Sequence, residues 1–251
     1  MVERRKIVSY LDELLKITEI KDSSCNGLQV EGENTIRKIG LAVDACLAVY
    51  QKAVESGCQM ILVHHGLIWG GIKAIRGPHY RQIRYLMEHG LNLYGAHLPL
   101  DLHSEVGNNI ELARLLKLRR IKPFGLYEGM MIGYTGALGK PVGVQRLSDQ
   151  LQATLGGQSI LLPFGKTKNQ TVAIVSGGAG NELGEVVEKG IDCYVTGEPV
   201  HWNHHWALEN RTNVIYLGHY HSEQLGVRAV GKKLEKRFKV ETVFLDVPTA
   251  V

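Results

Sequence analysis

The sequence predicts an α/β fold composed of two similar modules. Apolar runs of strand length alternate with helical patterns along almost the whole chain, which is typical of α/β proteins. A strand–helix–strand pattern in the first half recurs in the second half. The chain has 251 residues, of which 44% are hydrophobic and 22% charged, enough for one large domain or two of ordinary size.

The predicted strands are short apolar runs bounded by glycine or polar residues. They cover residues 39–43, 60–64, 91–97, 131–137, 171–175, 193–196, 214–217 and 242–247. The predicted helices are longer segments with apolar residues three and four positions apart. They cover residues 2–18, 46–56, 80–88, 105–116, 144–155, 182–188 and 223–238.

The repeated pattern divides the chain near its middle. Each half contains a strand, a helix that ends at a glycine (Gly57 or Gly190) and a further strand. Glycine suits a helix C-terminus, where φ is often positive. Proline and glycine accumulate near 122–129, so the predicted modules are residues 1–125 and 126–251. The C-terminal helix and strand are candidates to pack back on the first module.

Composition and charge argue against several classes of protein, including membrane and secreted proteins. No apolar run approaches the roughly 20 residues that span a bilayer, and the N-terminal segment lacks the apolar core of a signal peptide. We therefore expect a cytoplasmic protein with no membrane partner. The four cysteines form no C-x-x-C pair, which favours buried, reduced thiols. The net charge of +4 is only mildly basic, so DNA is retained as an alternative partner.

Two similar segments end in groups that bind metals. An apolar run is followed by His97 and, four residues later, by Asp101. Another apolar run is followed by His219 and, four residues later, by Glu223. Both the two histidines and the two carboxylates are 122 residues apart. Imidazole and carboxylate groups at strand ends are what a divalent metal site requires.

A third histidine site, His64-His65, also follows an apolar run. Adjacent side chains on a strand point to opposite faces, so both reach one site only if the chain turns, which Gly66 makes easy. Ligands of open α/β sheets gather beyond the carboxyl ends of the strands. If the two modules face each other, the cleft between them receives these groups from both and forms a dinuclear metal site.

Several such ligands suit two divalent ions better than one, with open positions left for water as in catalytic sites. Paired metals about 3.5–4 Å apart can stabilise charge during hydrolysis. Each histidine–acid pair taken alone could instead be a buried histidine and a helix-capping carboxylate, but its repetition favours metal binding. Mixed imidazole and carboxylate ligands suit zinc, iron, manganese or nickel about equally well.

Other polar residues accompany these motifs. By the repeat, Glu198 corresponds to the second of the paired histidines, and it is a candidate acid/base or ligand-orienting group. His201 and His205 form either a substrate-binding wall or a helix start packed by aromatic rings, and His221 is a further candidate to line the pocket. The glycine-rich turn at 177–180 could cradle an anion, although such a turn is more often only a turn.

Five motifs, in this order, resemble one family, the GTP cyclohydrolase 1 type 2 homologues, also called the NIF-three-like family. The motifs are Asn26-Gly-Leu-Gln-Val30, His64-His65-Gly66, Gly95-Ala-His97-Leu-Pro-Leu-Asp101, Thr196-Gly197-Glu198 and Gly218-His219-Tyr-His-Ser-Glu223. They span nearly the whole chain, whose length resembles that of the short members without an inserted domain. One departure is Gly66, because many members have proline after the double histidine.

The resemblance implies a two-metal centre between two similar α/β modules, with one carboxylate bridging the ions. The implied ligands are His64, His65, Asp101, His219 and the bridging Glu223. His97 would then lie behind the ligands. The resemblance also implies a toroidal homohexamer whose metal centres face an internal cavity. The family name implies opening of the guanine imidazole ring of GTP by metal-activated water, with release of formate.

Three functions follow from these observations. The first is a metal-dependent hydrolase that acts on a nucleotide or a related small molecule. The second is a toroidal DNA-binding or regulatory protein in which the metals are structural. The third is metal delivery or storage, which predicts exchangeable ions and no catalysis.

Overall fold

The computed structural model describes residues 1–250, which form two compact units. The first unit comprises Met1–Val106 and Gly226–Val247, and the second comprises Gly107–Leu225 with the residues from Pro248. The first segment of the first unit thus ends before the boundary near residue 125 that the sequence suggested. No helix within residues 1–250 is both long and apolar enough to cross a membrane.

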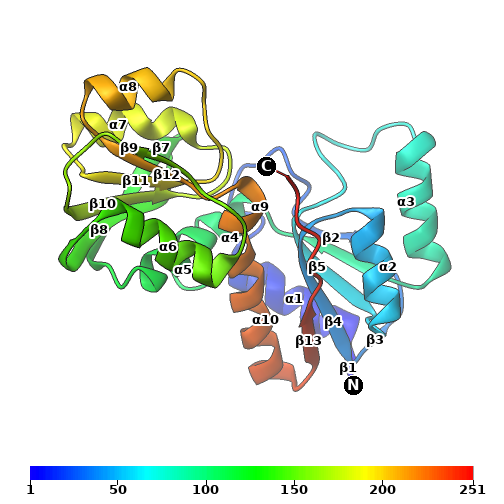
Figure 1. The fold of residues 1–251 in the computed structure, drawn as a ribbon. Coiled ribbons are helices and arrows are strands. Elements are labelled where there is room, and N and C mark those ends of the chain that lie inside the picture. Colours follow the sequence, from blue (N-terminus) through cyan, green and yellow to red (C-terminus); the bar gives the residue numbers. More distant parts are fainter. Residues whose placement is uncertain (251) are drawn as a thin grey trace. The chain divides into compact units, whose positions relative to one another are not determined.

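A five-stranded sheet forms the centre of the first unit, in the order β13-β4-β5-β6-β2 (Figure 1). The four parallel strands are β13 (Glu241–Phe244), β4 (Lys38–Asp44), β5 (Met60–His65) and β6 (Asn92–Gly95). β2 (Gly27–Val30) pairs antiparallel with β6. A separate antiparallel pair joins β1 (Val2–Glu3) to β3 (Thr35–Ile36).

Helices cover both faces of this sheet (Figure 1). They are α1 (Arg4–Leu15), α2 (Leu47–Glu55), α3 (Gly77–Glu88), the short α4 (Leu98–Asp101) and α10 (Gln224–Phe238). α1 and α10 bury apolar side chains against one face, and α2 and α3 against the other. Since successive side chains of a strand point to opposite faces, Leu62 of β5 joins the first core and Val63 joins the second.

A six-stranded sheet forms the centre of the second unit, in the order β7-β8-β10-β11-β12-β9. Its parallel strands are β10 (Asn169–Val175), β11 (Cys193–Thr196) and β12 (Asn213–Tyr216). β8 (Met130–Val142) and β9 (Ile160–Pro163) flank them antiparallel, and β7 (Arg119–Tyr127) forms a hairpin with β8. The predicted α/β class is therefore confirmed in both units.

Helices also cover both faces of the second sheet. α5 (Asn108–Leu115) and α6 (Val144–Leu155) pack on one face. The 3₁₀ turn η1 (Gly180–Glu182), α7 (Leu183–Glu188) and α8 (Asn203–Glu209) lie over the other, and α9 (His219–Ser222) follows β12. Leu147, Leu151 and Leu155 of α6 are four residues apart, which places them along one buried stripe.

Both units fix the starts of their central strands in the same way. Gln59 accepts hydrogen bonds from two successive backbone N–H groups at the start of β4, and Asp192 does the same at the start of β10. Asn92, which begins β6, and Asn213, which begins β12, each bond the backbone of a neighbouring turn. These asparagines are 121 residues apart, so the turn after β12 is one residue longer than the turn after β6.

Candidate metal centre

Three histidines come together at the carboxyl ends of β5 and β6. His64 and His65 are the last two residues of β5, and His97 follows β6 at the start of α4. Because β5 and β6 are parallel neighbours, their carboxyl ends meet at the same edge of the sheet. One ring nitrogen from each histidine lies within 4.8 Å of the other two, so the group could hold a metal ion.

The paired histidines are oriented by different acceptors. His64 is fully buried, and its Nδ1 lies 2.9 Å from the carbonyl oxygen of Ala96. His65 is half-buried, and its Nδ1 lies 2.8 Å from Oδ1 of Asp44, the last residue of β4. Carbonyl and carboxylate oxygens only accept, so Nδ1 carries the proton in both rings. The Nε2 atom of each neutral ring is then the one that can bind a metal.

His97 is held by the loop that precedes β2. Its Nδ1 lies 3.0 and 3.1 Å from the two carboxylate oxygens of Asp22, and its backbone N–H donates to Asn26. Asn26 in turn donates to Asp22. Burial raises the pKa of Asp22, but the hydrogen bond from His97 and those from neighbouring donors outweigh it and hold the pKa below its usual range. Asp22 is therefore a carboxylate that fixes the His97 ring.

Asp101 places a carboxylate beside this histidine group. It is the last residue of α4 and only 7% exposed. Its Oδ2 lies 3.4 Å from Nε2 of His64. Together the two side chains offer one oxygen and one nitrogen ligand to a cation.

The second unit carries a corresponding pair after β12. His219 begins α9, and Glu223 follows that helix with only 3% of its surface exposed. His219 Nδ1 lies 2.7 Å from Oε1 of Glu198, and its Nε2 lies 3.0 Å from Oε2 of Glu223. Burial lowers the pKa of His219, but the hydrogen bonds and charges of the two carboxylates outweigh it and raise the pKa to about 9.

Gly177 makes room for this pair. It follows β10 with a φ of +67°, and a Cβ atom built on it would lie 2.3 Å from Oε1 of Glu223 and 3.3 Å from Nε2 of His219. Its backbone N–H donates to Ser222, and its carbonyl oxygen accepts from the N–H groups of Gly197 and Glu198. The amide of Gly177 is therefore used within the protein, so the glycine-rich turn serves the carboxylate site and this amide does not cradle an anion.

The four histidines share one arrangement. In each ring Nδ1 faces a protein oxygen, from Ala96, Asp44, Asp22 or Glu198. Metal-binding histidines almost always make such a bond through the second nitrogen, because it fixes the ring and its tautomer. The imidazole and carboxylate donors fit divalent zinc, iron, manganese or nickel.

The remaining predicted residues lie in different surroundings. Glu198 lines a pocket of about 330 Å³ in the second unit, together with Tyr216. His201 and His205 are exposed on and just before α8 and do not line this pocket. His221 packs against Gly157, where an added Cβ would lie 2.6 Å from the ring.

Sequence reasoning missed three residues that shape the site, namely Asp22, Asp44 and the role of Gly177. Asp44 had a detectable signal, because it directly follows the predicted strand at 39–43, which pairs with the strand that carries the paired histidines. Asp22 lies 75 residues from His97 and in no predicted element, so only the folded structure brings it there.

Comparisons with known proteins find relatives that match nearly the whole chain. The model of the Duf34/NIF3 (NGG1p interacting factor 3) family matches residues 2–250. A Pyrococcus abyssi protein named GTP cyclohydrolase 1 type 2 homolog is 42% identical, over 100% of both chains. An Archaeoglobus fulgidus protein of the same name is 41% identical over 97% of this chain and 98% of its own.

Solved structures are similar as well. The crystal structure of a Thermus thermophilus protein has a TM-score of 0.92 at 42% identity and covers 100% of both chains. Reduced HcgD from Methanocaldococcus jannaschii has a TM-score of 0.85 at 25% identity and covers 98% of both chains.

Proposed function

This chain belongs to the Duf34/NIF3 family, and on that premise we propose that it is a dinuclear metal-dependent hydrolase of a nucleotide or a related small molecule. The observation that carries the proposal is the shared arrangement of the histidines, whose Nδ1 atoms are bound to protein oxygens. Such a bond fixes the orientation and the tautomer of the ring, which an ordinary surface histidine leaves free. It therefore suits a ring whose other nitrogen binds a metal.

The proposed ligands come from both units. They are His64, His65, Asp101, His219 and Glu223, with Glu223 shared between the two ions. His219 and Glu223 supply two ligand atoms, fewer than the three protein ligands typical of a catalytic zinc site. The second unit therefore needs further donors, and the histidine edge of the first unit is the proposed source. Zinc, iron, manganese and nickel all remain candidates.

Two further residues are proposed to position groups and move protons. We propose that His97 supports the ligands without binding a metal itself, with its ring fixed by Asp22. Glu198 bonds Nδ1 of His219 and also lines the 330 Å³ pocket. We propose that Glu198 orients His219 as a ligand and accepts a proton from a water molecule during the reaction. Bound metals would supply the remaining chemistry, by lowering the pKa of a water molecule and stabilising developing negative charge.

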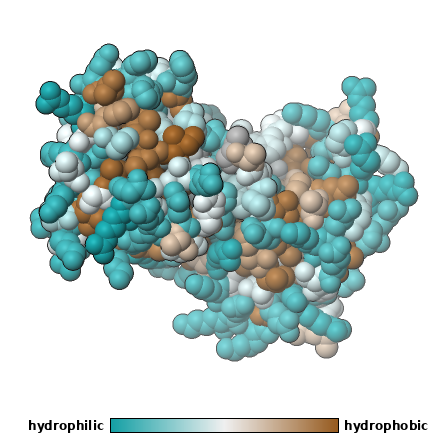
Figure 2. Space-filling model, in the orientation of Figure 1, coloured by the Kyte–Doolittle hydropathy of each residue, from teal (hydrophilic) through white to brown (hydrophobic). Residues whose placement is uncertain are grey.

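GTP is the first substrate to test, because the relatives carry the name GTP cyclohydrolase 1 type 2 homolog. The proposed reaction is hydrolytic opening of the guanine imidazole ring with release of formate. We propose a homohexamer as the assembly. An apolar patch on the visible face of the second unit supports self-association (Figure 2), and exposed apolar residues of that unit include Ile160, 54% exposed.

The test compares wild type with Glu223→Gln, and uses Glu209→Gln on the surface of α8 as the control. Elemental analysis after metal reloading and formate release from GTP are measured on the same samples. Two metals per chain and metal-dependent formate in wild type and control, with both reduced in Glu223→Gln, are expected. Two metals without formate would keep the site and reject GTP as substrate. No stoichiometric metal in wild type would overturn the proposal, and light scattering would report whether six 27.8 kDa chains assemble.

A further inference from the structure

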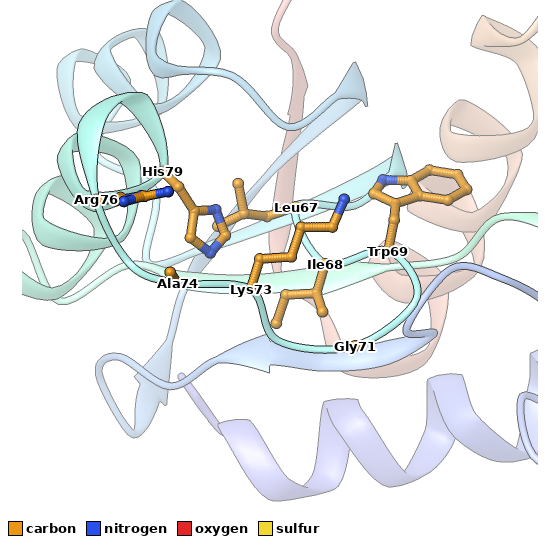
Figure 3. A pocket seen from close by; sticks show the side chains of 8 residues that line it. All are labelled: Leu67, Ile68, Trp69, Gly71, Lys73, Ala74, Arg76 and His79. Atoms are coloured by element: carbon orange, nitrogen blue, oxygen red, sulfur yellow. The ribbon is translucent and has the colours of Figure 1, made fainter.

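A basic pocket lies beside the histidine edge of the first unit. It follows β5, has a volume of about 480 Å³ and is lined by the segment from Leu67 to His79 (Figure 3). Its size falls within the roughly 300–1,000 Å³ of small-molecule sites. Lys73, Arg76 and His79 line it together with the Trp69 indole, and no acidic side chain among the described residues does.

The basic side chains of this pocket lack partners in the part of the chain that the structure describes. Among residues 1–250, no ion pair or side-chain hydrogen bond includes Lys73, Arg76 or His79. Arg84, further along α3, is by contrast paired with Glu88. Lys73 and Arg76 are cationic at neutral pH, and no carboxylate of the described residues lines the pocket to balance their charges. The charge of the pocket is therefore suited to an anionic ligand.

The start of α3 adds to this positive field. Arg76 is the N-cap residue of this 12-residue helix, and no side chain caps the backbone N–H groups of its first turn. The N-terminal end of a helix carries a partial positive charge, which favours phosphate and other anions. Side-chain charge and the helix end thus act in the same direction.

Trp69 connects the pocket to the histidines. Its ring centroid lies 4.9 Å from that of His97, edge to face, and 6.2 Å from that of His65. The indole N–H donates to the carbonyl oxygen of Gly66 at 2.7 Å, which fixes the ring. In the view of Figure 3 the Lys73 side chain extends toward this indole. A ligand held by the basic groups would therefore reach the histidine edge across Trp69.

We propose that this pocket binds the phosphate groups of a nucleotide and directs its nucleoside across Trp69 toward His65 and His97. The binding step needs only the pocket, whereas its role in presenting a substrate rests on the proposed function. The aromatic surface suits a planar base, which stacks on indole rings. The cations supply charge-assisted hydrogen bonds to phosphate oxygens.

The test uses full-length protein carrying Trp202→Phe and Trp206→Phe, so that Trp69 is the single tryptophan. Its fluorescence is titrated with GTP, with guanosine and with inorganic tripolyphosphate, with metals present and after chelation. Lys73→Ala and Arg76→Ala are each expected to weaken GTP binding by about tenfold or more, the worth of a charge-assisted hydrogen bond. Arg81→Ala, on the exposed surface of α3, is the matched control, and metal content should be unchanged in all variants.

Guanosine binding as tightly as GTP would overturn the inference, as would unchanged GTP affinity in Arg76→Ala. Tripolyphosphate binding as tightly as GTP would reject the nucleotide and leave a phosphate site. The proposed function can fail separately. GTP binding without formate release would support the pocket and reject the proposed GTP hydrolysis. Formate release with an unchanged KM in Lys73→Ala would support the hydrolysis and reject the pocket.

Discussion

Replacing Gly177 with alanine tests the site in the second unit most directly. The residue has a φ of +67°, a region where an alanine costs about 1–2 kcal/mol. Its new Cβ would lie 2.3 Å from Oε1 of Glu223, a separation that real Cβ atoms do not show. Because Glu223 is buried, its carboxylate must leave the position in which it faces His219.

Gly177→Ala should therefore lower both stability and metal affinity. For a chain of this length about 1–2 kcal/mol lowers the melting temperature by about 2–8 °C. Disturbing the surroundings of a metal ligand typically weakens metal binding by about 10–100-fold. Thermal denaturation of metal-free protein measures the first effect, and titration with Zn²⁺ or Mn²⁺ measures the second.

Gly178→Ala is the matched control, because its Cβ would meet Oε2 of Glu198 at 3.5 Å, an ordinary contact, and its φ is not in the left-handed region. It should leave the melting temperature and metal titration close to those of wild type. Wild-type metal affinity in Gly177→Ala would refute the reasoning, since it would mean that Glu223 need not occupy its observed position to bind metal.

Three further predictions concern other parts of the chain. Asp192→Ala should destabilise the protein by about 1–3 kcal/mol, because two backbone N–H groups lose a buried acceptor. Burial raises the pKa of Asp192, but its hydrogen bonds have the larger effect and hold the pKa below its usual value. This stabilisation is therefore present above the ordinary aspartate pKa near 3.8 and is lost as the pH falls through the pKa of the folded protein. The urea midpoints of wild type and variant should converge in acid. Gly184→Ala, in α7 with no atom within 4 Å of the new Cβ, should raise stability by about 0.5–1 kcal/mol in the same assay. Asp44→Ala should weaken metal binding by about 10–100-fold at unchanged melting temperature, because His65 loses the acceptor that orients it, and normal zinc titration would contradict this.

The sequence predicted the central strands well because these are buried and apolar, and their pattern survives without tertiary information. It missed β2, β7 and β9, which pair antiparallel near or at sheet edges. β7 contains Pro123 and Gly125 and is largely exposed, so it lacks the apolar signal of a central strand. The predicted helix at 2–18 is shorter at both ends, because residues 2 and 3 pair as β1 and the helix stops at Leu15, before Lys16 with its φ of +52°.

The candidate site was predictable to the extent that its residues recur at a fixed interval. Both histidine–carboxylate pairs were identified because they recur 122 residues apart, although the starts of the strands before them are 121 residues apart. The partners that orient the rings were less accessible, because Asp22 is distant in sequence from His97 and belongs to an irregular loop. Hydrogen bonds between a loop and a strand end depend on the folded backbone and leave no periodic pattern.

The division of the first unit between both ends of the chain has a consequence for synthesis. Its core under α1 includes Val227, Val230 and Leu234 of α10, and β13 supplies the strand next to β4. On the ribosome, the segment 107–225 therefore emerges in full before the N-terminal unit can close its core. The unit that is translated first should therefore be the last to finish folding. The apolar surface that α10 covers should stay exposed until α10 and β13 have been translated.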